Sequence, residues 1–376
     1  MLSIFRILFL NNQVINKYRV FIKIIAYFFL IFFILRYAQE IHNGGNSWKT
    51  GDWLINYEGG WVRRGLIGQG LYNLSAVLGV NLLWSAFFLQ SLIYFFIAYL
   101  VLKLYFSAER EVSSLAIIFS PAFIFLFPFN DFQGGFRKEI IVFLSFCLLA
   151  VGLMKGHFNQ RYLVLSLILY IIAVFSHEIA AFCLVFFLYL LFESKTFDPT
   201  KKGIIRFYLI CFSIAGVSGL TFSVLYPGTV DTSNAICESI KILGLNQDIC
   251  EGSIDSLKYD LSYGSAEVIK RLPQYLRFYP ILIILSMIPV FLTDWWKKRL
   301  LLILSGFISM IPLFIIAIDW GRFIHVYIFM TFVFLLFDSC NNFIEFKKLP
   351  LGFVLMYVCL WGIAHADTHL PSLIKY

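Results

Sequence analysis

Four groups of ionisable residues stand at the ends of hydrophobic segments in this chain. If the hydrophobic segments cross a membrane, charged side chains at their ends lie near the hydrocarbon, which is costly unless they pair with one another or line a water-filled cavity. They are therefore the residues whose types and spacing could do chemistry. The groups are Asp52, Glu58, Arg63 and Arg64; Asp131 with Gly134-Gly135-Phe136-Arg137-Lys138-Glu139; Ser176-His177-Glu178; and Asp319, Arg322 and His325.

The arginines of these groups have the chemistry of a phosphate site. A guanidinium is a planar fork of donors that grips two phosphate oxygens at once and keeps its charge in a low-dielectric site. Nearby glycines allow close approach of the backbone. The alternative is that each arginine forms a helix-end salt bridge with a carboxylate of Asp52, Glu58, Glu139 or Asp319. The candidate phosphate ligands are Arg63, Arg64, Arg137 and Arg322, beside Gly65, Gly135 and Gly321.

A proton acceptor could come from the His177-Glu178 pair, which interrupts two apolar runs. A carboxylate or imidazole there could serve as a general base, with a proton affinity set by burial and by neighbouring arginines. Asp52 and Asp319 are the next candidates. The alternative is a tight polar turn between two helices. Ser176 does not complete a catalytic triad, because adjacent residues do not aim at one another.

The stretch from Gly51 to Gly65 combines aromatic and charged side chains in a mostly apolar protein. Its rings, those of Trp53, Tyr57 and Trp61, could form a sugar-stacking surface beside Arg63 and Arg64. Asp52 and Glu58 in the same stretch either do chemistry or hold the arginines in place.

The elements that must position these residues are membrane helices. Of the 376 residues, 60% are hydrophobic and 14% are charged, which is typical of a polytopic all-α membrane protein. We expect one membrane domain, 1–376, with about eleven spans. The expected spans are 20–37, 82–104, 112–129, 138–154, 162–176, 178–193, 204–226, 276–293, 300–318, 324–337 and 350–365, of which the shorter ones could be tilted, broken or re-entrant.

The distribution of charge predicts which segments share a side. With the N-terminus inside, alternation places more than half of the 30 Lys and Arg residues in inner segments, as the positive-inside rule requires. The net charge of +8 therefore reflects topology, and nucleic-acid binding is not expected. All four ionisable groups then fall on the outer side.

Two outer loops are long enough to contribute structure. The first, 38–81, forms an interfacial segment, and the second, 227–275, is expected to hold short helices and to act as a lid or as a structural cap. Cys237 and Cys250 lie in the second loop, whereas the other five cysteines fall in spans or inner segments. This distribution predicts a Cys237–Cys250 disulfide in an oxidising compartment, with two unpaired thiols as the alternative.

Other cofactor signals are weak or missing. No phosphate-binding loop of the Walker type occurs, so ATP hydrolysis is not expected. The histidines have no metal-ligand spacing apart from a weak hint at His365 and His369. We therefore predict neither a metal nor a cofactor.

About eleven spans, one large outer loop, outer arginines and carboxylates, and no nucleotide motif together resemble the Wzy-type O-antigen and capsule polymerases of Gram-negative bacteria. Those proteins are similar to glycosyltransferases of the C superfamily, which use lipid-linked sugar donors at the extracytoplasmic face. The likeness covers the whole chain but is architectural, and it transfers no catalytic residue.

The resemblance implies that a glycan moves from undecaprenyl pyrophosphate to a sugar hydroxyl of an incoming lipid-linked repeat. It implies a bacterial inner-membrane location, contact with membrane lipid and a chain-length regulator protein as a partner. The protein must then stabilise the departing pyrophosphate and accept one proton. Catalytic candidates are Glu178, His177, Asp52 and Asp319, and substrate-binding candidates are Arg63, Arg64, Arg137, Arg322, Glu58, Glu139, Trp53 and Trp61.

Other functions stay open at this point. A C-superfamily enzyme that adds one sugar from a polyprenyl phosphate would use a carboxylate pair in its first outer loop, where Asp52 and Glu58 lie. A flippase or transporter of lipid-linked oligosaccharides would bind the headgroup with the same basic residues, but its charges should also line a path through the membrane. An integral acyltransferase would need a cytoplasmic histidine, and only His157 is expected there.

Overall fold

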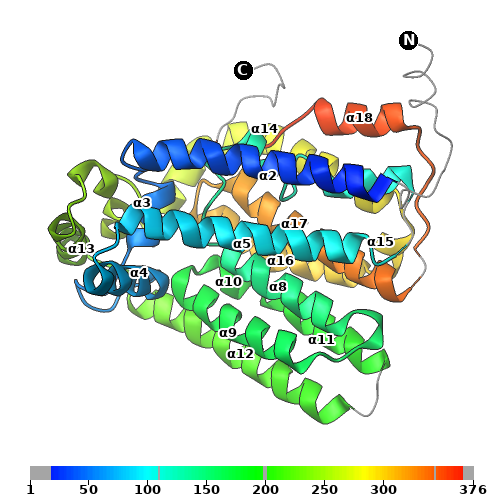
Figure 1. Cartoon of the computed structure of the whole chain (residues 1–376), viewed down its shortest axis with the longest axis horizontal. Helices are drawn as coiled ribbons and strands as arrows, with labels where there is room; N and C mark the ends of the chain where they lie inside the picture. The colour runs from blue at the N-terminus through cyan, green and yellow to red at the C-terminus, as the bar shows by residue number, and fades with distance from the viewer. Residues whose placement is uncertain (1–17, 109–110, 198–200, 343, 367–376) are drawn as a thin grey trace.

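The computed structural model describes residues 18–108, 111–197, 201–342 and 344–366. Over these residues the chain forms helices and no strand, and the long helices run back and forth along one common direction (Figure 1). The expectation of an all-helical chain is confirmed. Part of the predicted N-terminal inner segment, together with His369, lies outside the described residues.

Within the described residues, five helices are long and apolar enough to cross a membrane. Four of them carry exposed apolar side chains, such as Phe28 and Val217, a surface typical of contact with lipid, whereas the fifth, which begins at Trp320, is buried. The five are α2 (Arg19–His42), α5 (Leu82–Tyr105), α12 (Lys202–Leu225), α14 (Leu261–Phe291) and α17 (Trp320–Asn341). Shorter apolar helices accompany them: α8 (Ile140–Leu153), α9 (Gln160–Ser176), α10 (Ile179–Phe182) with α11 (Leu184–Phe197), and α16 (Leu300–Ile316).

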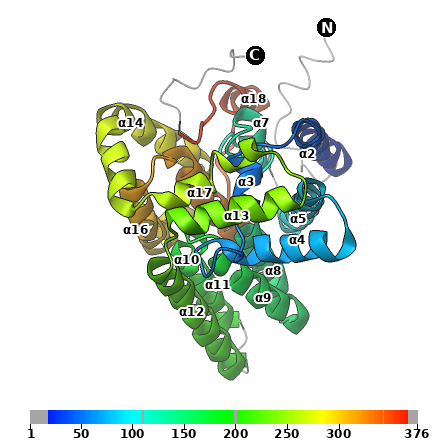
Figure 2. The same cartoon turned by 90° about the vertical axis from the view of Figure 1, so that its left-hand side faces the viewer.

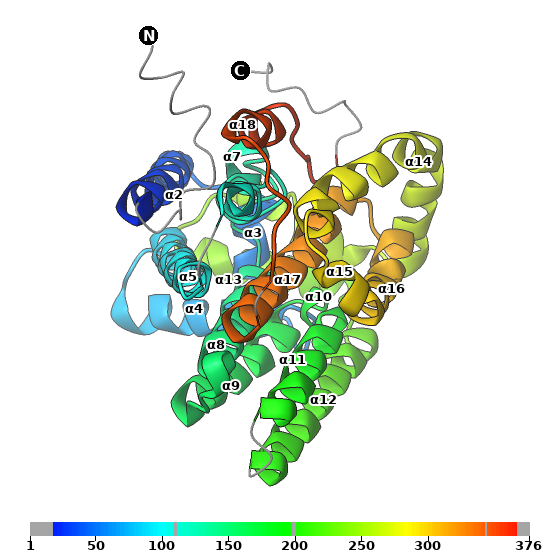
Figure 3. The ribbon, with the colours of Figure 1, turned by 90° about the vertical axis from the view of Figure 1, so that its right-hand side faces the viewer.

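Helix α17 forms the centre of the molecule. Every residue from Trp320 to Ser339 is buried, and the helix is apolar around its whole circumference beyond its first turns. A helix with that pattern belongs in a protein interior. Figure 3 shows it surrounded by α8, α11, α14 and α16, which the contacts of α17 confirm. Its polar first turns, which carry Arg322 and His325, are therefore held inside the bundle.

The predicted span 112–129 is not one helix. It forms η2 (Val112–Ser114), α6 (Leu115–Ile118) and α7 (Phe127–Asn130), with irregular backbone between them. Pro121 and Pro128 lack the N–H that a continuous helix needs, which explains the breaks. Most of the segment is buried, and His325 Nδ1 donates to the Ala122 carbonyl over 2.8 Å. Irregular backbone is tolerated at membrane depth only when protein surrounds it, as it does here.

The predicted span 350–365 is also shorter than expected. Helix α18 covers only Leu351–Cys359, and residues 360–366 continue as an extended segment, here named the C-terminal strap. The strap returns to the start of α17, where Gly321 N donates to the His365 carbonyl over 2.9 Å. A side chain at position 321 would come within 1.9 Å of the Ala364 carbonyl oxygen, so this approach requires glycine.

The two predicted outer loops lie at the same end of the molecule, on the left of Figure 1. The first contains α3 (Lys49–Leu54) and α4 (Gly65–Leu78), and α4 runs across the direction of the long helices (Figure 2). The second contains α13 (Val230–Ile242), η5 (Gln247–Cys250) and η6 (Asp255–Lys258), and its last residues begin α14. The remaining short helices are η3 (Met154–Gly156) and α15 (Trp295–Lys298).

The second loop is a cover packed on the first. Asn56 donates to the Ser239 hydroxyl over 3.1 Å, and the Ser253 hydroxyl donates to the Trp48 carbonyl over 2.6 Å. Cys237 and Cys250, the pair that the sequence singled out, are joined by a disulfide that links α13 to η5. The loop therefore covers the stretch that contains Asp52 and α3.

Candidate functional site

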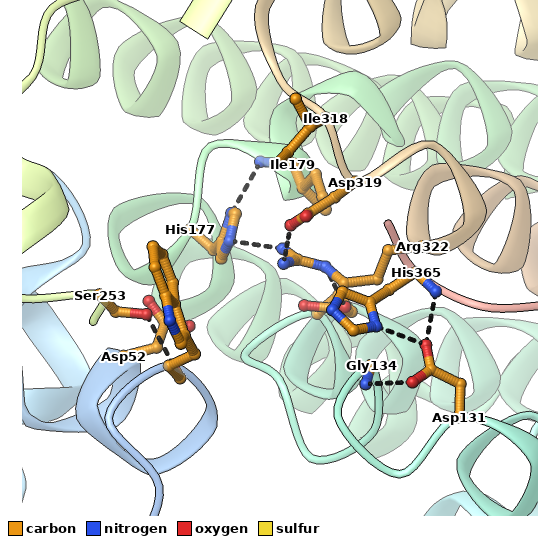
Figure 4. Close-up of polar contacts among 12 residues, drawn as sticks. Asp52, Asp131, Gly134, His177, Ile179, Ser253, Ile318, Asp319, Arg322 and His365 are labelled. Carbon is orange, nitrogen blue, oxygen red and sulfur yellow. Dashed lines mark hydrogen bonds and ion pairs between the residues drawn. The ribbon is translucent and has the colours of Figure 1, made fainter. Parts of the chain in front are cut away.

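All four ionisable groups of the sequence contribute residues to one cluster. The first outer loop supplies Asp52 and Arg64, the loop 131–139 supplies Glu139, and the break between α9 and α10 supplies His177 and Glu178. The start of α17 adds Arg322, which contacts two of these groups and Asp319 (Figure 4). Segments far apart in the sequence thus meet at the end of the bundle that carries the cover.

Arg64 and Glu178 form a two-point ion pair. Arg64 Nε lies 3.1 Å from Glu178 Oε1 and 2.9 Å from Oε2, and Nη2 also bonds Oε1. Burial alone would raise the pKa of Glu178, but the charge and hydrogen bonds of Arg64 outweigh it and hold the pKa well below its usual range. Both oxygens of Glu178 therefore accept hydrogen bonds from Arg64, which makes Glu178 a weak candidate for the base.

Arg322 is shared between three partners. Its Nη1 lies 2.5 Å from Asp319 Oδ2, its Nε lies 2.9 Å from Glu139 Oε1, and its Nη2 lies 3.1 Å from His177 Nε2. The contact with Glu139 is an ion pair without a hydrogen bond, because neither Arg322 Nε nor the Glu139 oxygens has a hydrogen-bond partner among the described residues. Arg322 ties the start of α17 to the start of α8 and to the break between α9 and α10.

His177 stays neutral in this setting. Its Nε2 faces the Arg322 guanidinium, and its Nδ1 lies 3.3 Å from the Ile179 amide nitrogen and 3.6 Å from Glu178 Oε2. Burial, with the charges of Arg64 and Arg322, lowers the pKa of His177 to about 3, although Glu178 opposes this shift. Both ring nitrogens already have partners, Arg322 and the Ile179 amide, so His177 is not available as the base.

One strained residue shapes the loop 131–139. Phe136 has a φ of +57°, which costs a non-glycine residue roughly 1–3 kcal/mol and is typical of functional sites. Its carbonyl accepts from Trp53 Nε1 at 2.8 Å and from Gln90 Nε2 at 2.7 Å, and its amide donates to the Tyr94 hydroxyl over 3.1 Å. These bonds fix the backbone just before Arg137, Lys138 and Glu139.

Asp52 is the carboxylate of the cluster with the longest ion-pair distance. It is completely buried, and neither of its oxygens accepts a hydrogen bond from the described residues; Arg64 Nη1 is 3.9 Å from Oδ1. Burial opposes ionisation, but the charges of Lys138, Arg137 and Arg64 outweigh it and lower the pKa of Asp52 to about 2. Asp52 is thus ionised, and neither of its oxygens is occupied by a hydrogen bond from the described residues; this availability, not its proton affinity, makes it the leading base.

Arg137 is a buried cation that, like Asp52, makes no hydrogen bond with a described residue. Its side chain is 7% exposed, and no hydrogen bond or ion pair joins it to another described residue. Its neighbour Lys138 is also buried and donates from Nζ to the Arg64 carbonyl over 2.7 Å. Burial and the charges of Arg64 and Arg137 lower the pKa of Lys138 to about 8, so it is still largely charged at neutral pH. Arg63 lies at the edge, half-buried, with no hydrogen-bond partner for its buried Nε.

Three residues predicted to bind substrate lie apart from the ion pairs. Trp53 is fully buried and serves as a donor to Phe136, so its ring offers no face for stacking. Glu58 is exposed and accepts from Gln69 Nε2 over 2.9 Å, so it forms no carboxylate pair with Asp52. Trp61 is 64% exposed beside Tyr57, at a ring separation of 5.0 Å, and keeps an aromatic surface available.

Sequence reasoning missed several supporting residues. Lys49 is fully buried, pairs with Glu40 and lies 3.4 Å from the centre of the Phe132 ring. Gln90 bridges Tyr37 and Phe136. The sequence marked His365 only as a weak metal hint, but it bonds Asp131. None of these partners has a spacing that a single sequence could reveal.

Comparisons with models of known protein families, with curated proteins and with solved structures find no match to this chain. The site itself must therefore support any functional inference. Among the described residues there is no group of three or more His, Cys, Asp or Glu side chains that could hold a metal ion. The chemistry available here is that of the Arg137 guanidinium, the Lys138 ammonium and the Asp52 carboxylate, which accepts no hydrogen bond from the described residues, all held by a frame of ion pairs.

Removal of Arg322 is expected to destabilise the protein strongly. Arg322→Met leaves Glu139, a nearly fully buried carboxylate, without its cation, and breaking a buried pair in this way costs roughly 3–5 kcal/mol of unfolding free energy. Denaturant unfolding of the purified protein in detergent would measure the loss. The double variant Arg322→Met/Glu139→Gln should recover part of it, and equal stability of single variant and wild type would contradict the assignment.

Proposed function

We propose that this chain transfers a glycan from undecaprenyl pyrophosphate to a sugar hydroxyl of a second lipid-linked repeat, and so polymerises a surface polysaccharide. The observation that carries the proposal is that Arg137, buried and without a hydrogen bond or ion pair to a described residue, lies in the same charge cluster as Asp52, a buried carboxylate without a hydrogen bond from the described residues, at one end of an apolar helical bundle. A buried charged group left without a hydrogen bond costs folding free energy, so a ligand or a reaction is the natural reason to keep it.

Arg137 and Asp52, the two buried charged residues described above, suit the two needs of this reaction: stabilisation of the leaving group and acceptance of a proton. The bond between the sugar C1 and the pyrophosphate oxygen breaks, and the electron pair leaves with the pyrophosphate. Arg137, Lys138 and Arg63 would stabilise that negative charge. A new bond forms between C1 and the acceptor oxygen, and Asp52 would take the acceptor proton.

The paired residues would form the frame of the site. Arg64 with Glu178, and Arg322 with Glu139 and Asp319, cross-connect the loops that carry Asp52 and Arg137. The exposed ring of Trp61, with the partly buried ring of Tyr57 beside it, would contact sugar at the rim. The polyprenyl chain would stay in lipid beside the bundle, and the site would face the outer side of a bacterial inner membrane, with the N-terminus cytoplasmic. A chain-length regulator is a suitable partner at that face.

A second candidate is transfer of one sugar from a polyprenyl monophosphate, as in the C superfamily. The observation in its favour is Asp52, a buried carboxylate in the first outer loop that accepts no hydrogen bond from the described residues. Against it stands Glu58, which is exposed and cannot complete the carboxylate pair of that family.

Surface polysaccharide on a gel separates these functions. Arg137→Ala and Asp52→Asn would be expressed in a deletion strain beside the wild-type chain. Loss of polymerase activity leaves a single repeat on the lipid core, loss of a flippase leaves no surface repeat, and loss of a sugar transferase leaves a full ladder of altered composition. A normal ladder in the deletion strain itself would exclude the polymerase.

A further inference from the structure

The C-terminal strap makes a charged contact beside the ion cluster that none of the roles above uses. His365 Nδ1 lies 2.8 Å from Asp131 Oδ2, and the same oxygen accepts from the His365 backbone amide at 2.6 Å (Figure 4). The other oxygen, Oδ1, accepts from the Gly134 amide at 3.2 Å. Asp131 therefore joins the strap to the turn that leads into Phe136 and Arg137.

The strap is also bonded to α17 and α14. The His365 carbonyl accepts from Gly321 N, one residue before Arg322, and the Ala364 carbonyl accepts from the Tyr279 hydroxyl over 3.2 Å. Gly321 and Gly134 both leave no space for a Cβ, which would lie 1.9 Å from the Ala364 carbonyl and 2.4 Å from Asp131 Oδ2 respectively. Two closely fitted backbone segments, one before Arg137 and one before Arg322, thus meet at a single histidine.

We propose that His365 is a positioning residue, whose contact with Asp131 holds the Arg137 loop and the start of α17 in register for binding a lipid pyrophosphate. This inference rests on the proposed function for its ligand, whereas the contact itself can be tested without it. His365 touches neither of the groups proposed to react, so it acts through Asp131 and Gly321.

The contact should depend on pH with a defined sign. The charged groups that face His365 are Asp131 and Arg137 from the loop and Asp319 from the start of α17. Burial opposes protonation, but the hydrogen bond and charge of Asp131, together with Asp319, raise the pKa of His365. The charged contact is therefore complete below the ordinary histidine pKa and is lost as pH rises through the raised value.

The test uses the full-length protein in lipid nanodiscs with two readouts. The first is hydrogen exchange of the peptides that contain residues 131–139 and 360–366. The second is the affinity for undecaprenyl pyrophosphate as a function of pH. The variants are His365→Leu, which removes the donor, His365→Asn, which keeps a donor that does not titrate, and His157→Leu, an exposed histidine far from the cluster, as the control.

We expect His365→Leu to speed exchange in both peptides and to weaken binding about 10- to 100-fold, the scale of a small misplacement of binding groups. His365→Asn should restore most of the affinity and abolish the loss of affinity that wild type shows as pH rises through the pKa of His365. If hydrogen exchange were unchanged in His365→Leu, the contact would not link the C-terminal strap to the loop 131–139. Faster exchange with unchanged affinity would overturn the positioning role. If the wild-type protein did not bind undecaprenyl pyrophosphate, the proposed ligand would be refuted. Hydrogen exchange would still show whether His365 links the strap to the loop 131–139.

Discussion

Asp52→Asn is expected to abolish glycan transfer while the protein stays folded. The substitution keeps the shape of the side chain but removes the charge that accepts the proton, and loss of a general base slows a reaction by roughly 100- to 10,000-fold. The amide breaks no hydrogen bond from the described residues, but it removes the charge that faces Lys138, Arg137 and Arg64, so a moderate loss of stability is expected beside the loss of rate. The rate would be measured in membranes supplied with the lipid-linked material extracted from a deletion strain.

The matched control is Glu58→Gln. Glu58 lies in the same loop and is also a carboxylate, but it is exposed and its partner is Gln69. It should transfer at the wild-type rate. If Asp52→Asn transferred as fast as Glu58→Gln, the base would have to be sought among the paired carboxylates.

Arg137→Met is expected to weaken ligand binding without lowering stability. Loss of hydrogen bonds from a guanidinium to phosphate, worth about 1.5–3 kcal/mol, should weaken undecaprenyl pyrophosphate binding about 10- to 100-fold. In the free protein no described residue pairs with this guanidinium, and burial with the charge of Arg322 lowers the pKa of Arg137. An apolar chain of similar length should therefore leave the melting temperature unchanged or raise it.

Thermal unfolding and pyrophosphate binding on the same nanodisc samples would show this contrast. Arg277→Met, at an exposed position of α14, should change neither quantity. A fall in melting temperature like that expected for Arg322→Met would show that Arg137 is a structural residue, and the phosphate site would have to be moved.

The sequence predicted most of the helices because each is a long apolar run, and it predicted the shared location of the charged groups because helices that alternate in direction bring every second loop to one end. It also marked Cys237 and Cys250 through their loop. It did not predict the breaks in 112–130, although Pro121 and Pro128 stand there, because a buried apolar run satisfies the hydropathy criterion whether or not it is helical.

The roles within the cluster could not be predicted, because they depend on which charges pair. Glu178 led as the base from its position in the sequence, yet it is bound by Arg64, 114 residues away. Trp53 and Trp61 have equivalent neighbours in the sequence, but one is buried beneath Phe136 and the other is exposed. Partner choice between distant segments is set by the packing of the bundle, which a single sequence does not record.

The broken segment 112–130 also sets an order of assembly during synthesis. Its Ala122 carbonyl is bonded to His325, which lies 203 residues further along the chain, and Phe123 stacks on Phe329 at 5.3 Å. Irregular backbone has no stable place in lipid without surrounding protein. Residues 112–130 can therefore complete their packing only after α17 leaves the ribosome, so the domain closes around a helix that is made long after the segment that packs against it.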